Sequence, residues 1–163
     1  MNTDEYYKIM EIERSGETVE ALLMLKKLAK KGDALALLDL STRYYSTEGY
    51  VYPVEHIEPD HAYSEELFFK AKESFEKLAA DGSGEAMRML ANFYLGAWGP
   101  YIERSIEKAE TLLLESIEAK NYFSANELAS MYLGRDLKKA KYYYQMAKEH
   151  DCLVIKNDAF ETS

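Results

Sequence analysis

Apolar residues recur along the chain at the spacing of amphipathic helices. Four stretches each begin at an alanine, with a large side chain four residues later and a further small or apolar residue in most of them seven residues later. Positions 0, 4 and 7 lie on one side of a helix with 3.6 residues per turn, so this side is expected to be buried. The alanines are Ala21, Ala71, Ala109 and Ala140; the fourth positions are Leu25, Phe75, Leu113 and Tyr144, and the seventh are Leu28, Leu78, Ser116 and Ala147.

A second kind of helical stretch alternates with the first. Residues 82–96 align with residues 120–134, sharing a central Leu-Ala and a final Tyr-Leu-Gly, and an earlier copy runs from 32 to 46. Small residues recur in these stretches with large ones between them, which lets neighbouring helices interlock at interior density. The tyrosines at one repeated position, Tyr44, Tyr94 and Tyr132, are predicted to be packing residues, because aromatic stripes on helices usually face a core.

Glycines and capping residues mark where these helices end and begin. Glycine adopts the left-handed conformation of a helix C-terminus without a steric penalty, so Gly32, Gly82, Gly96 and Gly134 are predicted to end helices. The residues that follow three of the turns offer side-chain acceptors to the free backbone donors of the next helix. Asp33, Ser83 and Asn121 are therefore predicted N-caps.

The repeated unit is a helix, a short turn and a second helix, and the chain of 163 residues is predicted to form one all-α domain. Copies are placed at about 21–46, 71–96 and 109–134, with a last half-repeat at 140–151. The first copy is followed by an insertion at about 46–65, where Pro53 and Pro59 exclude a continuous helix. Since a single repeat cannot bury its own apolar face, residues 3–14 and 153–160 are predicted to cap the two ends.

Composition narrows the classes of partner. Twenty basic and 29 acidic residues give a formal net charge of −9, which repels nucleic acids and anionic membrane surfaces. A basic protein agrees with this charge, although an acidic balance also simply keeps many proteins soluble. Cys152 is the only cysteine, so no internal disulfide can form, and without a secretory signal or a run of ~20 apolar residues we expect a cytoplasmic protein.

With these turns and helices in place, the chain resembles the Sel1-like repeat (SLR) family, which is related to the tetratricopeptide repeats. The resemblance covers about residues 21–150, and its best copies are 71–96 and 109–134. Lys120 replaces the turn glycine, and Arg43 stands where Phe93 and Met131 stand in the other copies. The resemblance implies a right-handed α–α superhelix, or solenoid, that acts as a protein-interaction scaffold and brings no catalytic residues with it.

Three groups of residues are of types that could carry chemistry. His56, Glu58, Asp60 and His61 are metal-ligand types, but Pro59 interrupts the helix that a paired-histidine motif needs, so a solvated acidic loop is favoured. His150 is predicted at a helix end, where the helix dipole favours its charged form. Cys152 has no accompanying signature of a nucleophile. No metal or cofactor is predicted.

The partner-binding residues are predicted by counting from each turn. The resemblance implies that the first helix of a pair usually lines the concave side of the superhelix. Offsets 3, 6, 7 and 10 are expected to point outward, where an apolar set rimmed by polar residues suits recognition of a protein. Packing against neighbouring repeats is an equally favoured role for them. The set is Leu35, Leu38, Asp39, Thr42, Glu85, Arg88, Met89, Asn92, Phe123, Asn126, Glu127 and Ser130, with Tyr50 and Tyr52 of the insertion added as recognition tyrosines.

The leading functional prediction is a non-catalytic, bacterial, cytoplasmic protein that binds and neutralises a toxin, as immunity proteins do. A basic toxin would be drawn to an acidic partner by electrostatic steering. An adaptor for signalling or envelope assembly is the alternative, in which the apolar concave face matters more than charge. A metal-dependent hydrolase that uses the loop of His56 is a remote third possibility.

Overall fold

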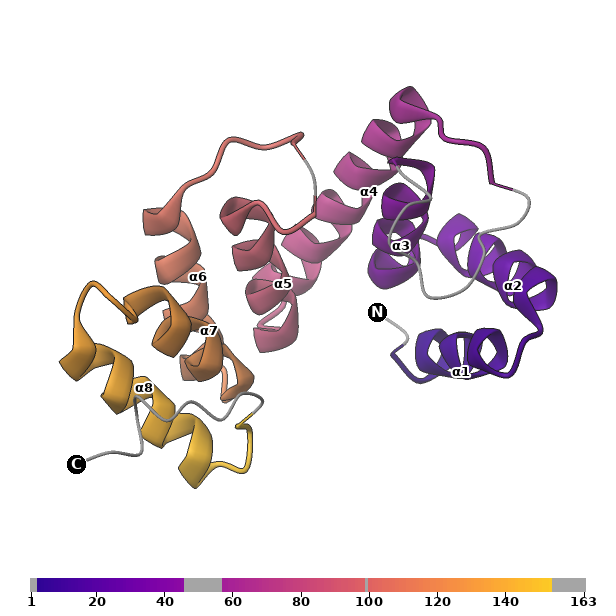
Figure 1. Cartoon of the computed structure of the whole chain (residues 1–163). Coiled ribbons are helices and arrows are strands. Elements are labelled where there is room, and N and C mark those ends of the chain that lie inside the picture. Colours follow the sequence, from indigo (N-terminus) through magenta and orange to yellow (C-terminus); the bar gives the residue numbers. More distant parts are fainter. Residues whose placement is uncertain (1–2, 46–56, 99, 154–163) are drawn as a thin grey trace. The chain divides into compact units, whose positions relative to one another are not determined.

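The computed structural model describes residues 3–45, 57–98 and 100–153, and within these ranges the backbone forms eight α-helices and no strand (Figure 1). The all-α class and its helix–turn–helix repeat are therefore confirmed. The helices are α1 (Thr3–Arg14), α2 (Thr18–Lys30), α3 (Ala34–Tyr45), α4 (His61–Ala80), α5 (Gly84–Leu95), α6 (Ile106–Glu118), α7 (Phe123–Tyr132) and α8 (Leu137–Glu149).

The chain divides into two compact units. Unit 1 is Met1–Leu78 with Trp98–Tyr101, and unit 2 is Ala79–Ala97 with Ile102–Ser163. Unit 1 therefore holds α1 to α3 and most of α4, and unit 2 holds α5 to α8. That residues 1–163 form a single domain stays a prediction.

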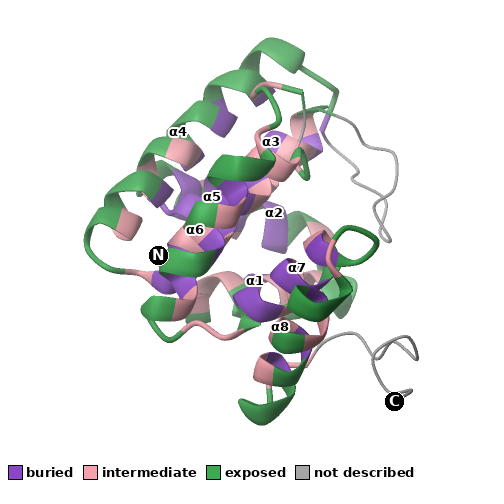
Figure 2. Ribbon diagram, turned by 90° about the vertical axis from the view of Figure 1, so that its left-hand side faces the viewer, coloured by how far each residue is buried: buried purple, intermediate pink, exposed green. Residues whose placement is uncertain are grey.

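The core of unit 1 lies where the repeated apolar positions predict it. In α2, Leu25 and Leu28 are buried, and α4 buries Phe68 and Phe75. The buried sides of these helices appear in purple in Figure 2, opposite exposed green sides. Ile9 of α1 is also buried, which confirms that residues 3–14 form a helix that caps the unit. Each fully buried side chain of this size stabilises the fold by roughly 1.5–3 kcal/mol.

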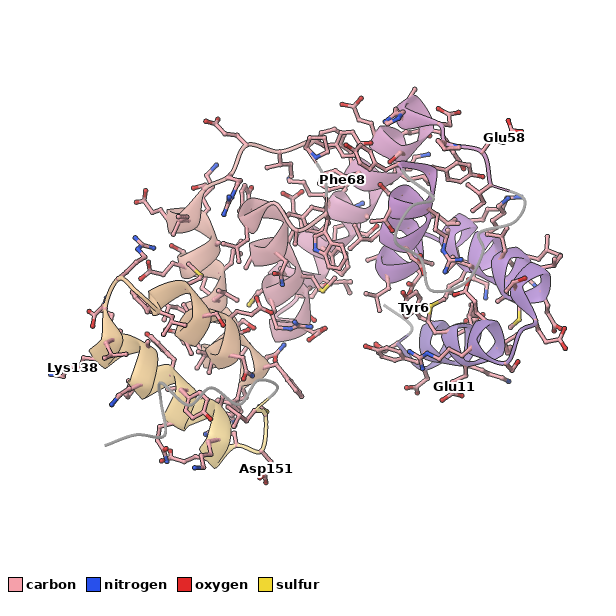
Figure 3. All side chains as sticks on the ribbon, viewed as in Figure 1. Tyr6, Glu11, Glu58, Phe68, Lys138 and Asp151 are labelled. Atoms are coloured by element: carbon pink, nitrogen blue, oxygen red, sulfur yellow. The ribbon has the colours of Figure 1, made fainter. Side chains whose placement is uncertain are left out.

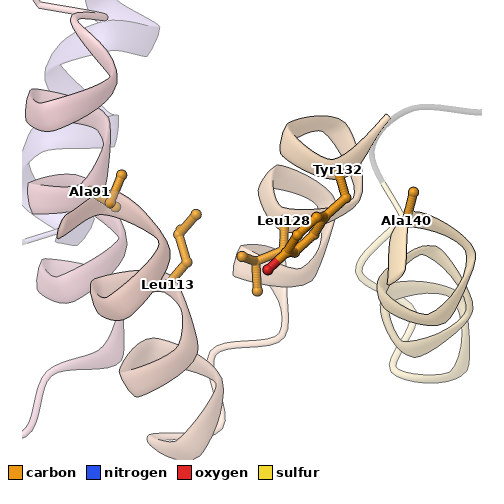
Figure 4. Packing of buried hydrophobic residues seen from close by; sticks show 6 residues of the cluster. Ala91, Leu113, Leu128, Tyr132 and Ala140 are labelled. Carbon is orange, nitrogen blue, oxygen red and sulfur yellow. The ribbon is translucent and has the colours of Figure 1, made fainter. Parts of the chain in front are cut away.

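The core of unit 2 interlocks small and large side chains from four helices. Leu113 of α6 and Leu128 of α7 lie between alanines on either side (Figure 4). The ring of Tyr132 stacks on that of Tyr143 of α8, with 5.8 Å between their centroids. Tyr132 is buried as predicted, whereas Tyr44 and Tyr94 at the equivalent positions are only partly buried. The buried cluster is Ala91, Ala109, Leu113, Leu128, Tyr132 and Ala140.

All four repeat turns contain a residue in the left-handed conformation. Gly32 and Gly82 have φ of 83° and 88°, and the residues at the two equivalent turns, Lys120 and Asp151, have φ of 65° and 53°. A left-handed conformation costs a residue with a side chain roughly 1–2 kcal/mol, so the shared geometry is imposed by the repeat and not by the residue type. The four turns thus share one backbone conformation, including the turn in which lysine replaces glycine.

Two of the three predicted N-caps are confirmed. Asp33 accepts hydrogen bonds from the backbone N–H groups of Leu35 and Ala36, each at 3.1 Å, and Ser83 accepts one from Ala86 at 3.3 Å. The prediction for Asn121 is wrong. Tyr122 occupies the N-cap position of α7, and the Asn121 side chain reaches across to α5 instead.

The part of the insertion that the structure describes leads directly into α4. This helix begins at His61, earlier than the predicted end of the insertion at about 65. Asp60 accepts a hydrogen bond from the backbone N–H of Tyr63 at 3.0 Å and caps the helix, which begins two residues after Pro59. Residues 46–56, which include Tyr50, Tyr52 and His56, lie outside the described residues, as do residues 154–160 of the predicted terminal cap.

Candidate protein-binding surfaces

Two of the predicted outward-pointing residues lie in the core. Leu38 is 3 % exposed and Met89 is 6 % exposed, so the prediction that they point outward is wrong. The apolar stripe of each helix is wider than offset counting assumed, and buried residues recur at the spacing i, i+3, i+4, i+7. The buried residues at this spacing are Ala34, Leu37, Leu38 and Ser41 in α3 and Ala86, Met89, Leu90 and Phe93 in α5.

In unit 1, helix α1 uses the predicted face of α3 as its own packing surface. The Tyr6 hydroxyl donates to Asp39 Oδ2 at 3.1 Å. Arg43 Nη2 donates to Glu13 Oε2 at 2.9 Å, and Arg43 Nε donates to Asp39 Oδ1 at 2.7 Å. Figure 3 shows Tyr6 on the side of α1 that faces α3 and Glu11 on the opposite side. Asp39 therefore binds α1 to α3.

The charges of this contact are fixed at neutral pH. Burial alone would lower the pKa of Arg43, but its hydrogen bonds to Glu13 and Asp39 outweigh burial and raise the pKa above its ordinary value. Burial, followed by the charge and hydrogen bond of Asp39, raises the pKa of Tyr6. Arg43 thus stays charged and Tyr6 stays protonated, and the departure of Arg43 from the repeat pattern is explained by its bond to α1.

In unit 2, four of the predicted residues are joined in one hydrogen-bonded set. Arg88 donates to Glu85 Oε1 at 2.7 Å and to Glu127 Oε1 at 2.8 Å, which links α5 to α7. Asn92 donates to Glu127 Oε2 at 3.0 Å, and Asn121 donates to Glu85 Oε2 at 3.0 Å. We call Glu85, Arg88, Asn92, Asn121 and Glu127 the α5–α7 network.

The α5–α7 network is partly exposed and keeps its charges. The side chains of Arg88 and Glu127 are 24 % and 21 % exposed. Burial would raise the pKa of Glu85, but the hydrogen bonds and charge of Arg88 and the bond from Asn121 outweigh it and lower the pKa. The result is a set of charged groups held in position by one another at the surface of unit 2.

The remaining predicted residues of α7 lie beside this network. Phe123, two residues after Asn121, is 48 % exposed, and Ser130 is exposed. Asn126 is partly buried and donates to the backbone oxygen of Cys152 at 2.5 Å, so it holds the turn after α8. We call the α5–α7 network together with Phe123 and Ser130 the α5–α7 face.

Unit 1 contains a concave surface that the sequence analysis missed. A cavity of about 720 Å³ lies between α2 and α4, with residues of α3 between them. We call it the lysine groove, because five lysines contribute to its lining. Its residues are Leu23, Lys26, Lys27, Ala29, Lys30, Gly32, Leu37, Leu40, Tyr44, Tyr63, Leu67, Lys70, Glu73, Ser74 and Lys77.

A local signal for the lysine groove was present in the sequence. Residues 26–31 contain four lysines, and Lys70 and Lys77 are seven residues apart on one helix. A spacing of seven places both on the same side of α4. The negative net charge of the whole chain does not reveal this local basic cluster.

Three of the residues considered for chemistry, Asp60, His150 and Cys152, have structural partners. Among the described residues, no three His, Cys, Asp or Glu side chains gather as they would around a metal. Asp60 caps α4, and the ring of His150, at the end of α8, is stacked on Tyr122 at 3.4 Å between centroids. The Cys152 thiol donates to the backbone oxygen of His150 at 3.2 Å, and burial, with the charge of Asp151, raises its pKa. In the part of the chain that the structure describes, no helix is both long and apolar enough to cross a membrane.

No protein-family model and no curated protein matches this chain. Solved structures that are similar to it include the following two. The Sel1 repeat protein from Oxalobacter formigenes is 18% identical with a TM-score of 0.47, over 80% of this chain and 49% of that one. The protein c5321, a protective antigen present in uropathogenic Escherichia coli strains displaying an SLR fold, is 20% identical with a TM-score of 0.46, over 80% of this chain and 33% of that one. This chain therefore spans about half the length of the first and a third of the second.

Proposed function

We propose that this chain is a non-catalytic module that binds another protein through the α5–α7 face. The observation that carries the proposal is the α5–α7 network, in which Arg88 is held between Glu85 and Glu127 while part of its surface faces solvent. Side chains already fixed in the free protein lose less entropy on binding. Arginine and aromatic residues also dominate the energetics of interfaces, and Phe123 supplies an exposed aromatic ring beside the network.

We further propose that the partner is a basic toxin that the chain neutralises by covering it. The formal net charge of −9 supports a basic partner, because opposite net charges raise the rate of encounter. The carboxylates of Glu85 and Glu127 give the α5–α7 face acceptors for lysine or arginine side chains. A neutralising protein needs only to occupy the surface of the toxin, so no catalytic group is required of it.

The test is binding of the basic protein domain encoded next to the gene for this chain, measured over a range of salt concentrations. We expect one-to-one inhibition of that domain and an association rate that falls as ionic strength rises. Phe123→Ala is expected to weaken binding about tenfold, or about 1.4 kcal/mol. The matched control is Tyr142→Ala, which removes another exposed aromatic ring from α8 outside the α5–α7 face.

Two results would contradict the proposal. An association rate that does not change with salt would remove the basis for a basic partner. Equal binding by wild type, Phe123→Ala and Tyr142→Ala would show that the partner is held elsewhere.

An adaptor that holds two proteins at once is the second candidate. The lysine groove favours it, because this surface carries the opposite charge to the chain as a whole. Recovery of two different partners in one complex would support the adaptor over a dedicated toxin inhibitor.

A further inference from the structure

We infer that the lysine groove of unit 1 is a docking site for an acidic amphipathic segment of a partner protein. The site shares no residue with the α5–α7 face, so it is independent of the toxin binding proposed above, and it is the surface on which the adaptor candidate rests. It requires a partner whose local charge is negative, although the chain that carries it is itself acidic.

The charge at the groove is strongly one-sided. Among the described residues, Glu73 is the single carboxylate in the lining, against five lysines. Glu73 pairs with Lys77, and Lys70 pairs with Glu66, both as exposed pairs four residues apart on α4. Such exposed pairs contribute little and exchange readily for another partner.

Among the described residues, the three lysines of α2 in the lining have no such neutralising partner. Within residues 3–45, 57–98 and 100–153, no carboxylate lies within ion-pair distance of Lys26, Lys27 or Lys30. The Lys26 ammonium group lies 5.9 Å from the centre of the Tyr44 ring, over its face. Three cations on one side of a groove create a positive potential that favours an acidic ligand.

Apolar groups in the groove favour a polypeptide over a simple anion. Leu37 and Leu40 of α3 and Leu67 of α4 contribute to the lining and are otherwise buried. At the α2 side, Leu23 is 64 % exposed, and Tyr63 of α4 is 39 % exposed. Leucine and tyrosine exposed beside lysines can cover the apolar side of an amphipathic segment while the lysines meet its carboxylates.

The length of the groove suits several turns of helix. Its lining on α4 extends from Tyr63 to Lys77, about 21 Å at 1.5 Å per residue. Its lining on α2 extends from Leu23 to Lys30, about 10 Å. An elongated surface of this kind fits a segment of about 14 helical residues better than a compact small molecule. Nucleic acid is disfavoured because the net charge of −9 repels it at longer range.

The experiment uses a fluorescein-labelled synthetic peptide of 14 residues, with leucines at spacings of three and four and glutamates elsewhere. Its binding to the full chain is measured by fluorescence anisotropy at low salt, beside a peptide in which lysines replace the glutamates. We expect the acidic peptide to bind and the basic peptide not to bind. Binding should weaken at least about tenfold in Lys27→Glu/Lys30→Glu and in Leu23→Asp.

The matched control is Lys138→Glu/Lys148→Glu. These two lysines are exposed on α8, so the control changes the net charge by the same amount outside the groove. All replaced side chains are at the surface, and circular dichroism checks that each variant keeps its helices. The control is expected to bind the acidic peptide as the wild type does.

Four results would overturn the inference. They are absence of binding, equal binding by the groove variant and the control variant, equally tight binding of a single-stranded DNA of matched charge, and a dimer in sedimentation that Leu23→Asp dissociates. The third would make the groove a general anion surface, and the fourth would make a second copy of the chain its occupant. Toxin binding is expected to be the same in Lys27→Glu/Lys30→Glu as in Lys138→Glu/Lys148→Glu, which has the same net charge, so this inference and the proposed function can fail separately.

Discussion

Replacing Arg43 by methionine would remove the guanidinium group from unit 1 while keeping most of the side chain's volume. The Arg43 side chain is 3 % exposed, and its two partners, Asp39 and Glu13, are 9 % and 15 % exposed. The variant would leave both carboxylates nearly buried and without their cation. Removing one member of a buried ion pair costs about 3–5 kcal/mol. Because Glu13 keeps some contact with water, we expect about 3 kcal/mol of lost stability.

This loss can be measured by urea unfolding with the fluorescence of Trp98. Trp98 is the only tryptophan of the chain and belongs to unit 1, so its signal reports on that unit, while circular dichroism follows the helices of both. Lys70→Met, which removes one end of an exposed pair in the same unit, is the control and should change little. Adding Glu13→Gln to Arg43→Met should recover part of the loss, because one of the two stranded charges is removed.

A loss of less than about 1 kcal/mol for Arg43→Met, or one equal to that of the Lys70 control, would refute this reasoning. It would mean that α1 is held by apolar contacts such as those of Ile9 and that the ion pairs add nothing. Hydrogen exchange provides a second check, since the amides of α1 should lose protection before those of α2 in the variant.

Three further predictions concern unit 2. Lys120→Gly should stabilise the α6–α7 turn by about 1 kcal/mol in thermal unfolding, because φ at this residue is 65°, and a loss of stability would contradict the assignment of strain. The lowered pKa of Glu85 means that its ion pair stabilises the fold above pH 4.5, the ordinary glutamate value, and that this stabilisation is lost as the pH falls below that value. In Glu85→Gln the free energy of unfolding should therefore fall less steeply at acid pH, and an unchanged slope would count against this. Gly84→Ala should lower the free energy of unfolding in urea by about 1–3 kcal/mol, because the added carbon would lie 2.9 Å from Asn121 Cβ and 3.0 Å from the Ser116 backbone oxygen. Asp81→Ala, at an exposed turn position, is the control, and an equally small effect of both variants would contradict the close approach.

Sequence alone predicted what depends on local geometry. Helical spacing, the glycines of the turns and the caps Asp33 and Ser83 all express constraints that act within a few residues. Lys120 and Asp151 adopt the left-handed conformation at the two turns where glycine is missing.

The candidate surfaces depended on contacts that join distant residues, and these were predicted less well. Counting from the turns assumed a narrow apolar stripe and therefore placed Leu38 and Met89 at the surface. Arg43 departs from the repeat pattern, and the sequence gives no reason for this because its partner Glu13 lies 30 residues away. The lysine groove is formed by α2 and α4 with α3 between them. The insertion separates α4 from α2 and α3 in the sequence, so no local pattern predicts that these helices line one cavity.

The bond between α1 and α3 also fixes where the first helix stands along its own axis. Tyr6 and Glu13 are seven residues apart, so they project from the same side two turns from each other, and both reach the pair formed by Asp39 and Arg43. A shift of one turn, about 5.4 Å, would leave the guanidinium facing the wrong side chains. An unrelated amphipathic helix grafted in place of α1 would therefore seat correctly only if it carried a hydroxyl and a carboxylate at this separation.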